Sequence, residues 1–367
     1  MSSLHNGYAF QSSKYCNDGN YYVITIANVQ DGEMVMTNDT NRVKVLPSDM
    51  QAHQKLKKGD LLISLTGNVG RICVVDRENC LLNQRVGLLS ITHSELINTE
   101  FLFYCLQTRR FQIQMINAGK GGAQPNIGKM DVLDFSFDYP SYKEQCVIAS
   151  SIRSINKHIS TLKSLISKYK AIKKSTVNLL LEPKNDWKEI LLGDIGDVLM
   201  CKRILKNQTT KIGDVPFYKI GTFGKIPDSF ISRALFDDFK QRFAYPQKGD
   251  VLLSAAGTIG RTVVFNGEDA YFQDSNIVWI DNDESLVINS FLYVLYSQMD
   301  WQTENGGTVS RLYNSNIRNT RVTIPSLKEQ KRIVAILDSI DETIHNLKSQ
   351  LVKTQNIKEG MMTYFFG

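Results

Sequence analysis

The sequence predicts an α+β protein built from two copies of one unit, each a β-rich globule that ends in a long helix. Residues 58–75 and 248–265 are identical at nine of 18 positions, at an offset of 190. Residues 140–163 and 325–348 are identical at eleven of 24 positions, at an offset of 185. Matches in the same order along the chain indicate an internal repeat. The segments 31–56 and 224–246 share almost nothing, so one scaffold carries two different surfaces.

Length and composition limit the class of protein. The chain has 367 residues, of which 42% are hydrophobic and 22% charged, enough for two or three folded domains. It has no apolar run long enough to span a membrane and no signal-peptide pattern at Met1. The six cysteines form no C-x-x-C pair, which favours thiols in the cytoplasm over a zinc site. The net charge of +6 is compatible with an anionic partner.

Sequence motifs of common catalytic sites are missing. The chain has no phosphate loop, no H-E-x-x-H, no G-x-G-x-x-G after a strand and no [DN]-P-P-[FYW] tetrapeptide. Pro227-Asp228 has no nearby Glu-x-Lys. Together these absences favour a chain without a catalytic site or metal site of its own.

Each globule is expected to be rich in strands. In the first copy, strands are predicted at 22–26, 61–65, 71–75 and 86–91, and in the second copy at 217–220, 251–254, 261–265 and 277–280. Lys-Gly-Asp at 58–60 and 248–250 predicts a tight turn before a buried strand. Helices are predicted at about 99–117 and 289–302.

Each copy is expected to end in a helix of about 39 residues. Ser141 and Ser326 precede Glu144 and Glu329 by three positions, which is the spacing of a capping box. Apolar residues then recur at steps of four and three, a heptad seam that predicts a helical partner. The predicted helix–helix interface comprises Ile148, Ile152, Ile155, Ile159, Leu162, Ile166, Ile333, Leu337, Ile340, Ile344, Leu347 and Leu351.

The two long helices are expected to pair antiparallel, with one globule at each end. Packing of each helix on its own globule is the alternative. A helix of this length spans about 58 Å, or one to two turns of duplex DNA. Residues 143–181 carry eight Lys or Arg against one Asp or Glu, which suits phosphate contacts or a solvated helix face equally well. Two different surfaces at a fixed spacing therefore favour double-stranded DNA as the partner.

The chain resembles the specificity subunit of type I restriction-modification systems. The resemblance rests on the repeated Lys-Gly-Asp-[LV]-Leu-[IL]-Ser…Gly-x-x-Gly-Arg block, the Pro-Ser-x-Lys-Glu-Gln helix start and the order of the segments. It implies target-recognition domains at 1–140 and 184–325, a central spacer helix at 141–183 and a C-terminal spacer helix at 326–367. Each domain would read one half of a split, asymmetric DNA sequence.

The resemblance also implies the partners. The spacer helices would dock two modification (methyltransferase) subunits, and restriction subunits would join the complex. S-adenosylmethionine, ATP and Mg would be bound by those partners, with no cofactor on this chain and no chemistry carried out by it.

One departure from the family pattern concerns the start of the first copy. The second copy begins Trp187-Lys188-Glu189-Ile190-Leu191-Leu192-Gly193-Asp194, as domains of the family do. The first copy begins near Leu4 and lacks this segment, so a first strand is expected to be missing from domain one. A misplaced start, a truncation or a strand supplied from elsewhere would each explain this.

The candidate DNA contacts are polar residues that follow predicted strands or lie in glycine-rich loops. Arg71 and Arg261 follow matched glycines and could hold a phosphate. Amide side chains can pair with adenine, and Arg with guanine. Turn structure, loop capping and ordinary surface exposure are the competing interpretations. The other candidates are Asn83, Gln84, Arg85, Lys120, Gln124, Gln273, Ser275, Asn276, Ser310, Arg311 and Tyr313.

Two hypotheses compete with the specificity subunit. One is a DNA-modifying enzyme with an unfamiliar site, which would show activity as the purified chain alone. The other is a two-headed scaffold that binds proteins. DNA binding with a salt slope proportional to the number of phosphate contacts would argue against the scaffold.

Overall fold

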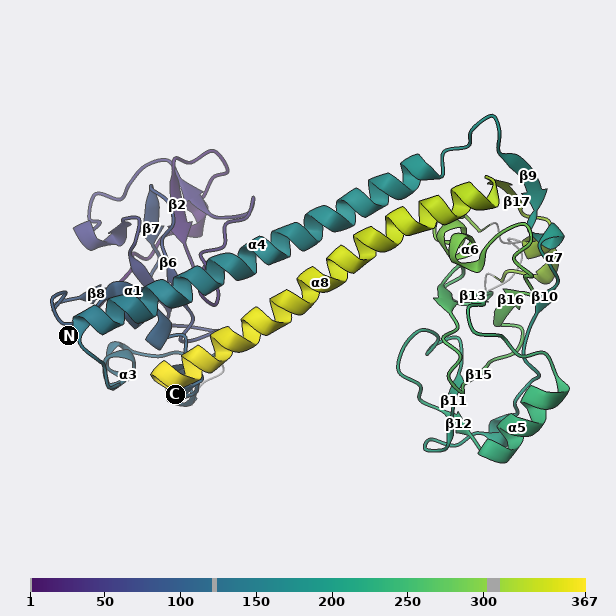
Figure 1. Cartoon of the computed structure of the whole chain (residues 1–367). Helices are drawn as coiled ribbons and strands as arrows, with labels where there is room; N and C mark the ends of the chain where they lie inside the picture. The colour runs from purple at the N-terminus through teal and green to yellow at the C-terminus, as the bar shows by residue number, and fades with distance from the viewer. Residues whose placement is uncertain (1, 121–123, 302–310) are drawn as a thin grey trace. The chain divides into compact units, whose positions relative to one another are not determined.

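The structure, a computed structural model, describes residues 2–120, 124–301 and 311–367. The chain divides into two compact units. Unit one comprises residues up to 164 together with 349–367, and unit two comprises residues 165–348. Each unit contains one globule and a stretch of both long helices (Figure 1).

The globule of unit one contains two four-stranded sheets. The first is antiparallel, in the order β1-β8-β5-β6, and the second has the order β3-β2-β7-β4 with β2 and β7 parallel. The strands are β1 (Ser2–Asn6), β2 (Tyr21–Ile24), β3 (Arg42–Val43), β4 (Lys55–Leu56), β5 (Leu61–Ser64), β6 (Ile72–Val74), β7 (Cys80–Leu82) and β8 (Val86–Ile91). Short 3-10 turns η1 (Ser12–Lys14) and η2 (Ala52–Gln54) connect them. β5 is buried along its whole length, as its continuous apolar run predicts.

The globule of unit two repeats the first sheet. Its order is β10-β16-β13-β14, and the equivalent residues occupy the same places as in unit one. A three-stranded sheet β12-β11-β15 and a two-stranded sheet β17-β9 complete it. The strands are β9 (Lys188–Leu191), β10 (Val198–Leu199), β11 (Val215–Tyr218), β12 (Phe230–Ile231), β13 (Val251–Ser254), β14 (Thr262–Val264), β15 (Tyr271–Phe272), β16 (Ile277–Ile280) and β17 (Arg321–Ile324), with turns η3 (Leu192–Asp194) and η4 (Lys206–Gln208). The predicted repeat is therefore present in the topology.

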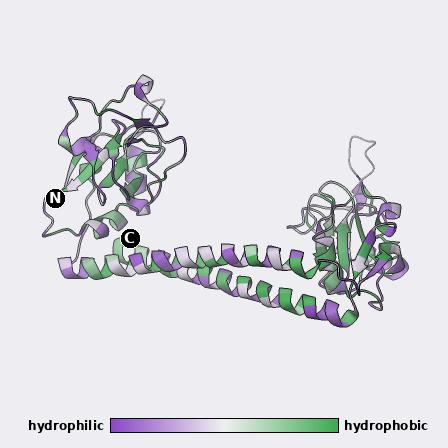
Figure 2. Ribbon diagram, turned by 90° about the horizontal axis from the view of Figure 1, so that it is seen from above, coloured by the Kyte–Doolittle hydropathy of each residue, from purple (hydrophilic) through white to green (hydrophobic). Residues whose placement is uncertain are grey.

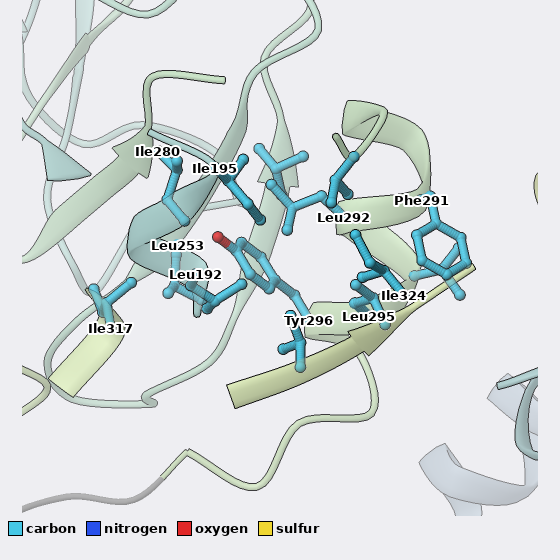
Figure 3. Packing of buried hydrophobic residues seen from close by; sticks show 14 of the residues in the cluster. Leu192, Ile195, Leu253, Ile280, Phe291, Leu292, Leu295, Tyr296, Ile317 and Ile324 are labelled. Carbon is cyan, nitrogen blue, oxygen red and sulfur yellow. The ribbon is translucent and has the colours of Figure 1, made fainter. Parts of the chain in front are cut away.

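The hydrophobic core of unit two joins its strands to its helices. Figure 3 shows Leu192, Ile195 and Tyr296 in one cluster with Leu253 and Ile280. Burial raises the pKa of the Tyr296 hydroxyl above its ordinary value. In both globules the central strands are formed mainly by hydrophobic residues (Figure 2).

The Lys-Gly-Asp segments form the predicted tight turns. Gly59 and Gly249 have φ angles of 97° and 101°, a region that L side chains rarely adopt. The carboxylates of Asp60 and Asp250 each accept a backbone N–H three residues upstream, at 2.7 Å. Each aspartate therefore stabilises the turn.

The predicted helix at 99–117 is wrong as one element. The structure has α1 (Thr99–Cys105) and α2 (Arg109–Ala118). Between them the Thr108 hydroxyl donates to the Cys105 carbonyl at 2.8 Å and accepts the Phe111 N–H at 3.4 Å, so that it ends one helix and caps the next. In unit two, the helix predicted from 289 ends early, as α6 (Asn289–Tyr296). The other short helices are α3 (Lys129–Leu133), α5 (Arg233–Arg242) and α7 (Asn314–Arg318).

The long helices are α4 (Tyr142–Leu180) and α8 (Leu327–Phe366), of 39 and 40 residues. At the start of α4, the Glu144 carboxylate accepts the Ser141 N–H at 3.0 Å and Ser141 Oγ accepts the Glu144 N–H at 3.4 Å, so the capping box is present. At the start of α8, Ser326 Oγ accepts the Glu329 N–H at 3.4 Å.

The Glu329 carboxylate takes a different role from that of Glu144. It lies 2.7 Å from the Arg332 guanidinium and 3.4 Å from the Lys184 ammonium. These cations, Arg332 first, lower the pKa of Glu329 to about 2.

A buried glutamine fastens each long helix to its globule. Gln145 is fully buried; its Oε1 accepts the Asn98 N–H, and its Nε2 donates to the Leu96 and Pro140 carbonyls, each at 2.9 Å. Gln330 is also fully buried and makes the same three bonds, to the equivalent N–H of Ile288 and the carbonyls of Leu286 and Pro325. The last residue of the repeated Pro-Ser-x-Lys-Glu-Gln motif is therefore a joint between helix and globule.

The two long helices pack antiparallel within each unit. In unit one the start of α4 lies with α1 and with the end of α8, where Ile148 and Ile152 share a cluster with Met361, Met362 and Phe365. In unit two the end of α4 lies with the start of α8, where Val177 shares a cluster with Ile333 and Leu337. Packing of helix on helix and packing of helix on globule therefore occur together, because the paired ends of α4 and α8 in each unit contact both the globule and each other.

The seam residues are all removed from solvent to some degree. Ile148, Ile152, Leu162, Ile166, Ile333, Leu337 and Ile344 are buried, and Ile155, Ile159, Ile340, Leu347 and Leu351 are half-buried. Figure 2 shows hydrophobic and hydrophilic residues alternating along both helices, as expected for helices with one packed face.

One ion pair distinguishes the two helix pairings. In unit two, Lys173 Nζ lies 2.6 Å from the Asp341 carboxylate. The equivalent residues of unit one are Lys358 and Asn156, so no carboxylate occupies that place. Burial and the charge of Lys163 lower the pKa of Lys358.

Neither a membrane-spanning helix nor a cluster of metal ligands is present among the residues that the structure describes. No helix of the described part of the chain is long and apolar enough to cross a membrane. Within the same residues, no group of three or more His, Cys, Asp or Glu side chains could hold a metal ion.

Candidate nucleic-acid interface

A basic groove lies on the globule of unit two. It has a volume of about 750 Å³ and is lined by loop residues 203–211, by parts of 217–229, by 273–276 and by Arg311. The lining has five basic residues (Arg203, Lys206, Lys211, Lys219 and Arg311) and two acidic ones (Asp228 and Asp274). This excess of positive charge suits a phosphate backbone.

Two of the basic side chains are already in ion pairs. Arg203 lies 2.9 Å from Asp274, and Lys219 lies 2.8 Å from Asp228. Lys206 and Lys211 are exposed, and no carboxylate lies within ion-pair distance of either of them in the described residues. These two ammonium groups are therefore the best placed to bind phosphate oxygens.

The predicted contacts of unit two divide between this groove and its surroundings. Gln273, Ser275, Asn276 and Arg311 line the groove. Gln273 Oε1 accepts the Ile220 N–H at 2.9 Å, and Arg311 donates to the Ser275 carbonyl at 2.9 Å. Both side chains therefore have structural partners, while the Gln273 amide nitrogen has no protein acceptor among the described residues.

One further candidate of unit two lies beside the groove lining. Tyr313 is half exposed, and the Arg311 guanidinium lies 6.0 Å from the centre of its ring. A phenol that projects in this way can stack on a base or sugar. Ser310, also a candidate, falls outside the residues that the structure describes.

A smaller groove lies on the globule of unit one. It has a volume of about 540 Å³ and brings Arg71 and Lys120 together with Gln112 and the loop 67–69. Lys120 Nζ donates to Asn117 Oδ1 at 2.8 Å. Gln124 is exposed, and its side chain lies beside Gly67. This groove carries less positive charge than the one in unit two, because two basic residues and Asp31 line it, against five basic and two acidic residues there.

The cluster at 83–85 lies apart from that lining. Asn83 is buried and its Oδ1 accepts the Arg85 N–H at 3.3 Å, which is the loop-capping role that the sequence left open. Gln84 and Arg85 are exposed and remain available to a ligand.

Arg71 and Arg261 share a structural role. The N–H of each donates to the serine of the preceding strand, Ser64 or Ser254, at 3.0 and 2.9 Å. The Arg71 guanidinium reaches Gln30, and that of Arg261 reaches the Phe223 carbonyl at 3.0 Å. Each arginine thus ties a loop outside the repeat to the repeated hairpin.

Four basic residues of the groove in unit two were not among the predicted contacts: Arg203, Lys206, Lys211 and Lys219. A signal was present, because residues 202–211 carry four basic residues and no acidic one. The connection between β1 and β2 holds the same place in the first copy but has a different sequence, so a comparison of the repeats does not detect this segment.

Comparison with known proteins identifies the family. The model of the type I restriction modification DNA specificity domain matches residues 1–170 and again residues 184–354. The chain belongs to this family. Two matched specificity domains agree with the two globules and with the predicted family resemblance.

Several specificity subunits are similar to the chain. A putative type I restriction enzyme specificity subunit of Haemophilus influenzae is 62% identical over 159 residues, which cover 43% of this chain and 41% of that protein. A putative type I specificity subunit of Mycoplasma pneumoniae is 23% identical, covering 95% of this chain and 89% of that one. Among solved structures, the S subunit of a type I restriction-modification system from M. genitalium has a TM-score of 0.60 at 16% identity and covers 100% of this chain and 94% of its own. The last likeness shows a common fold.

Proposed function

We propose that this specificity subunit reads a bipartite, asymmetric DNA target, with one globule for each half. The observation that carries the proposal is the pair of globules with one repeated sheet and different loop grooves. A shared scaffold gives both globules the same way of facing a duplex, and different loops give them different bases to read. We propose the division into target-recognition domains at 1–140 and 184–325 and spacer helices at 141–183 and 326–367.

The groove of unit two supports the reading of DNA most directly. Lys206 and Lys211 would bind phosphates, which set position, while the amides of Gln273 and Asn276 would meet base edges. In unit one, the exposed candidates are Gln84, Arg85, Lys120 and Gln124. Arg71 and Arg261 would have a structural role instead, because each ties a neighbouring loop to the repeated hairpin.

The proposal also assigns the chemistry to partner subunits. Specificity subunits are generally non-catalytic. The buried thiols of Cys73, Cys105 and Cys201 have pKa values raised to about 12 by burial, so they stay protonated near neutral pH and are poor nucleophiles. We propose that two modification subunits and the restriction subunits join this chain, and that S-adenosylmethionine, ATP and Mg are bound by them. The proposal places the complex in the cytoplasm, with the DNA.

The long helices would carry the docking surface for the modification subunits. Their polar faces are exposed, whereas Met361, Met362, Phe365 and Phe366 at the end of α8 pack against α1 and the start of α4. These four residues thus serve the internal helix pairing, which leaves the outer helix faces for a partner.

The test is to co-express the chain with its cognate modification subunit in a host without DNA methylation and to map modified adenines across the genome. We expect one split motif, modified on both strands and lost when the chain is omitted. A Lys206→Gln/Lys211→Gln variant should lower modification without changing the motif, because phosphate contacts carry no sequence information. A Gln273→Ala variant should relax one half of the motif only.

Two results would favour the other hypotheses. Modification by the purified chain without a partner would favour an enzyme. A stable complex with proteins but no binding to duplex DNA at low salt would favour a two-headed scaffold.

A further inference from the structure

The two most exposed large hydrophobic side chains of the described residues lie at the rim of one groove, the basic groove of unit two. Ile212 is 89% exposed and Ile226 is 88% exposed. Lys211, which lines the groove, comes directly before Ile212, and Asp228, which also lines it, lies two residues after Ile226. Neither isoleucine belongs to a hydrophobic cluster of the described globule, so neither stabilises its core.

Ile212 lies in a short turn that leads into β11. The chain before it is joined to β12, because Thr210 and Phe230 exchange two main-chain hydrogen bonds of 2.9 Å. Thr210 Oγ1 donates to the Ile212 carbonyl at 2.8 Å. A Cβ on Gly213 would lie 2.9 Å from the Phe230 Cβ, so the turn packs closely on β12. The backbone on both sides of Ile212 is therefore held in place by the protein itself.

Ile226 lies in the loop between β11 and β12. The Lys219 ammonium lies 2.8 Å from the Asp228 carboxylate, which joins the two ends of this loop. Within the loop, the Thr222 N–H donates to the Lys219 carbonyl at 3.0 Å, and the Lys225 N–H donates to the Thr222 carbonyl at 2.9 Å. Ile226 follows these turns directly, so its backbone is also fixed by contacts of the loop.

Neither the turns nor the core accounts for the two isoleucines. Turns favour glycine, proline, asparagine, aspartate and serine, and a β-branched aliphatic side chain contributes nothing to them. The loops that carry both isoleucines differ in sequence from their counterparts in the first copy, so they belong to the surface that distinguishes the two globules. An exposed aliphatic side chain at such a place points to an apolar contact with the ligand.

The base edges of duplex DNA offer one apolar group of this kind. In the major groove, the C5-methyl group of thymine lies among hydrogen-bond donors and acceptors. The amides of Gln273 and Asn276, which line the same groove of the protein, match the major-groove edge of adenine. An A·T pair that offers its adenine to an amide presents its thymine methyl on the same edge, within the same groove of the DNA.

We propose that Ile212 and Ile226 are specificity-determining residues that pack on thymine methyl groups in the half-site read by unit two. This role rests on the proposed function, and it adds that the half-site contains thymine. Burial of one methyl group should strengthen binding about fourfold. Because the turns are already formed, little of this gain is lost in ordering the side chains.

The test uses the complex of the full-length chain with its cognate modification subunits and fluorescein-labelled duplexes that carry the methylated motif. In matched duplexes, one thymine at a time is replaced by deoxyuridine, which lacks only the methyl group. We expect replacement of a contacted thymine, in one half of the motif, to weaken binding about fourfold in fluorescence anisotropy. Replacements in the other half report whether the effect is confined to one globule.

The variant Ile212→Ala/Ile226→Ala makes the test specific for the two side chains. It should bind the thymine duplex more weakly than the unsubstituted complex does, and it should bind the thymine and deoxyuridine duplexes equally. Such non-additivity is the sign of a direct contact. Both side chains are exposed, so folding should be unaffected. Val45→Ala is the matched control: Val45 is 81% exposed on unit one, and its loss should leave the ratio of the two affinities unchanged.

Three results would overturn the proposal. The first is equal binding of the thymine and deoxyuridine duplexes by the unsubstituted complex. The second is a double variant that still distinguishes the two duplexes. The third is a double variant that loses affinity by the same factor on both, because its isoleucines would then contact something other than the methyl group, such as a base step into which they insert. Each of these leaves the reading of DNA intact, whereas a complex that binds no duplex at low salt would overturn the proposed function as well.

Discussion

Replacing the buried glutamine of either joint should cost more stability than most single changes. The Gln145→Met variant keeps the length and volume of the side chain, so packing changes little. It removes three hydrogen bonds and leaves the Asn98 N–H and the Leu96 and Pro140 carbonyls without their partner. Each bond contributes about 1 kcal/mol net, and an unsatisfied buried group costs about 1–3 kcal/mol. We therefore expect a loss of roughly 3–5 kcal/mol in the free energy of unfolding.

The assay is urea denaturation, followed separately for each unit. Trp187, Trp279 and Trp301 all lie in unit two, so tryptophan fluorescence reports on Gln330→Met, and far-UV circular dichroism with hydrogen exchange at Asn98 reports on Gln145→Met. The exposed Gln350 on α8 supplies the control, since Gln350→Met should change stability by less than about 0.5 kcal/mol.

The outcome discriminates between a joint and a passive buried polar group. A Gln145→Met loss below about 1 kcal/mol would refute the assignment of three stabilising hydrogen bonds. A Gln145→Glu variant should also be destabilised at neutral pH, because a carboxylate can accept the Asn98 N–H but cannot donate to the two carbonyls.

Three further predictions concern charges. Asn156→Asp places a carboxylate beside Lys358, as Asp341 lies beside Lys173 in unit two. The change should raise the free energy of unfolding of unit one by about 0.5 kcal/mol, measured by chemical denaturation. Destabilisation would show that the two helix pairings are not equivalent. The ion pairs of the Glu329 carboxylate lower its pKa to about 2. They therefore contribute stability at pH values above its ordinary pKa near 4.5, and this stability is lost as the pH falls towards 2. Glu329→Gln should flatten the pH dependence of the unfolding midpoint of unit two between these pH values, and an unchanged profile would contradict the assignment. Lys206→Gln and Lys211→Gln should each reduce the slope of log K against log salt for duplex DNA by about 0.9, measured by anisotropy, whereas an unchanged slope would remove these lysines from the interface.

The repeated parts of the fold were predictable, because equivalent residues meet the same physical requirement twice. Gly59 and Gly249 adopt the same left-handed turn, and the strands after them occupy the same place in their sheets. The heptad seam predicted that the long helices pair, and the order of globules and helices along the chain predicted the antiparallel direction. The motif that ends in Gln145 was detected, but its role was not, because the bonds of the glutamine reach backbone atoms almost 50 residues away in the sequence.

The unrepeated parts were harder to predict. The break between α1 and α2 depends on two hydrogen bonds of one hydroxyl, that of Thr108, which a periodic apolar pattern does not reveal. The groove of unit two brings Lys206 and Lys211, which lie in one loop, together with Lys219 at the end of β11. Charge in the sequence indicates an anionic partner, but only the folded loops show which cations have carboxylate partners.

The glutamine joints have a consequence for how such a chain can diversify. Gln145 and Gln330 bond only main-chain atoms of the globules they hold. A main-chain amide or carbonyl presents the same atoms whatever side chain its residue carries. The hydrogen bonds of the joint therefore do not depend on the side chains of the loop that the glutamine contacts. Mutation or recombination can therefore replace the reading surface of a globule while the coupling to its helix stays intact. New DNA specificities can arise on this scaffold without a compensating change at the glutamine.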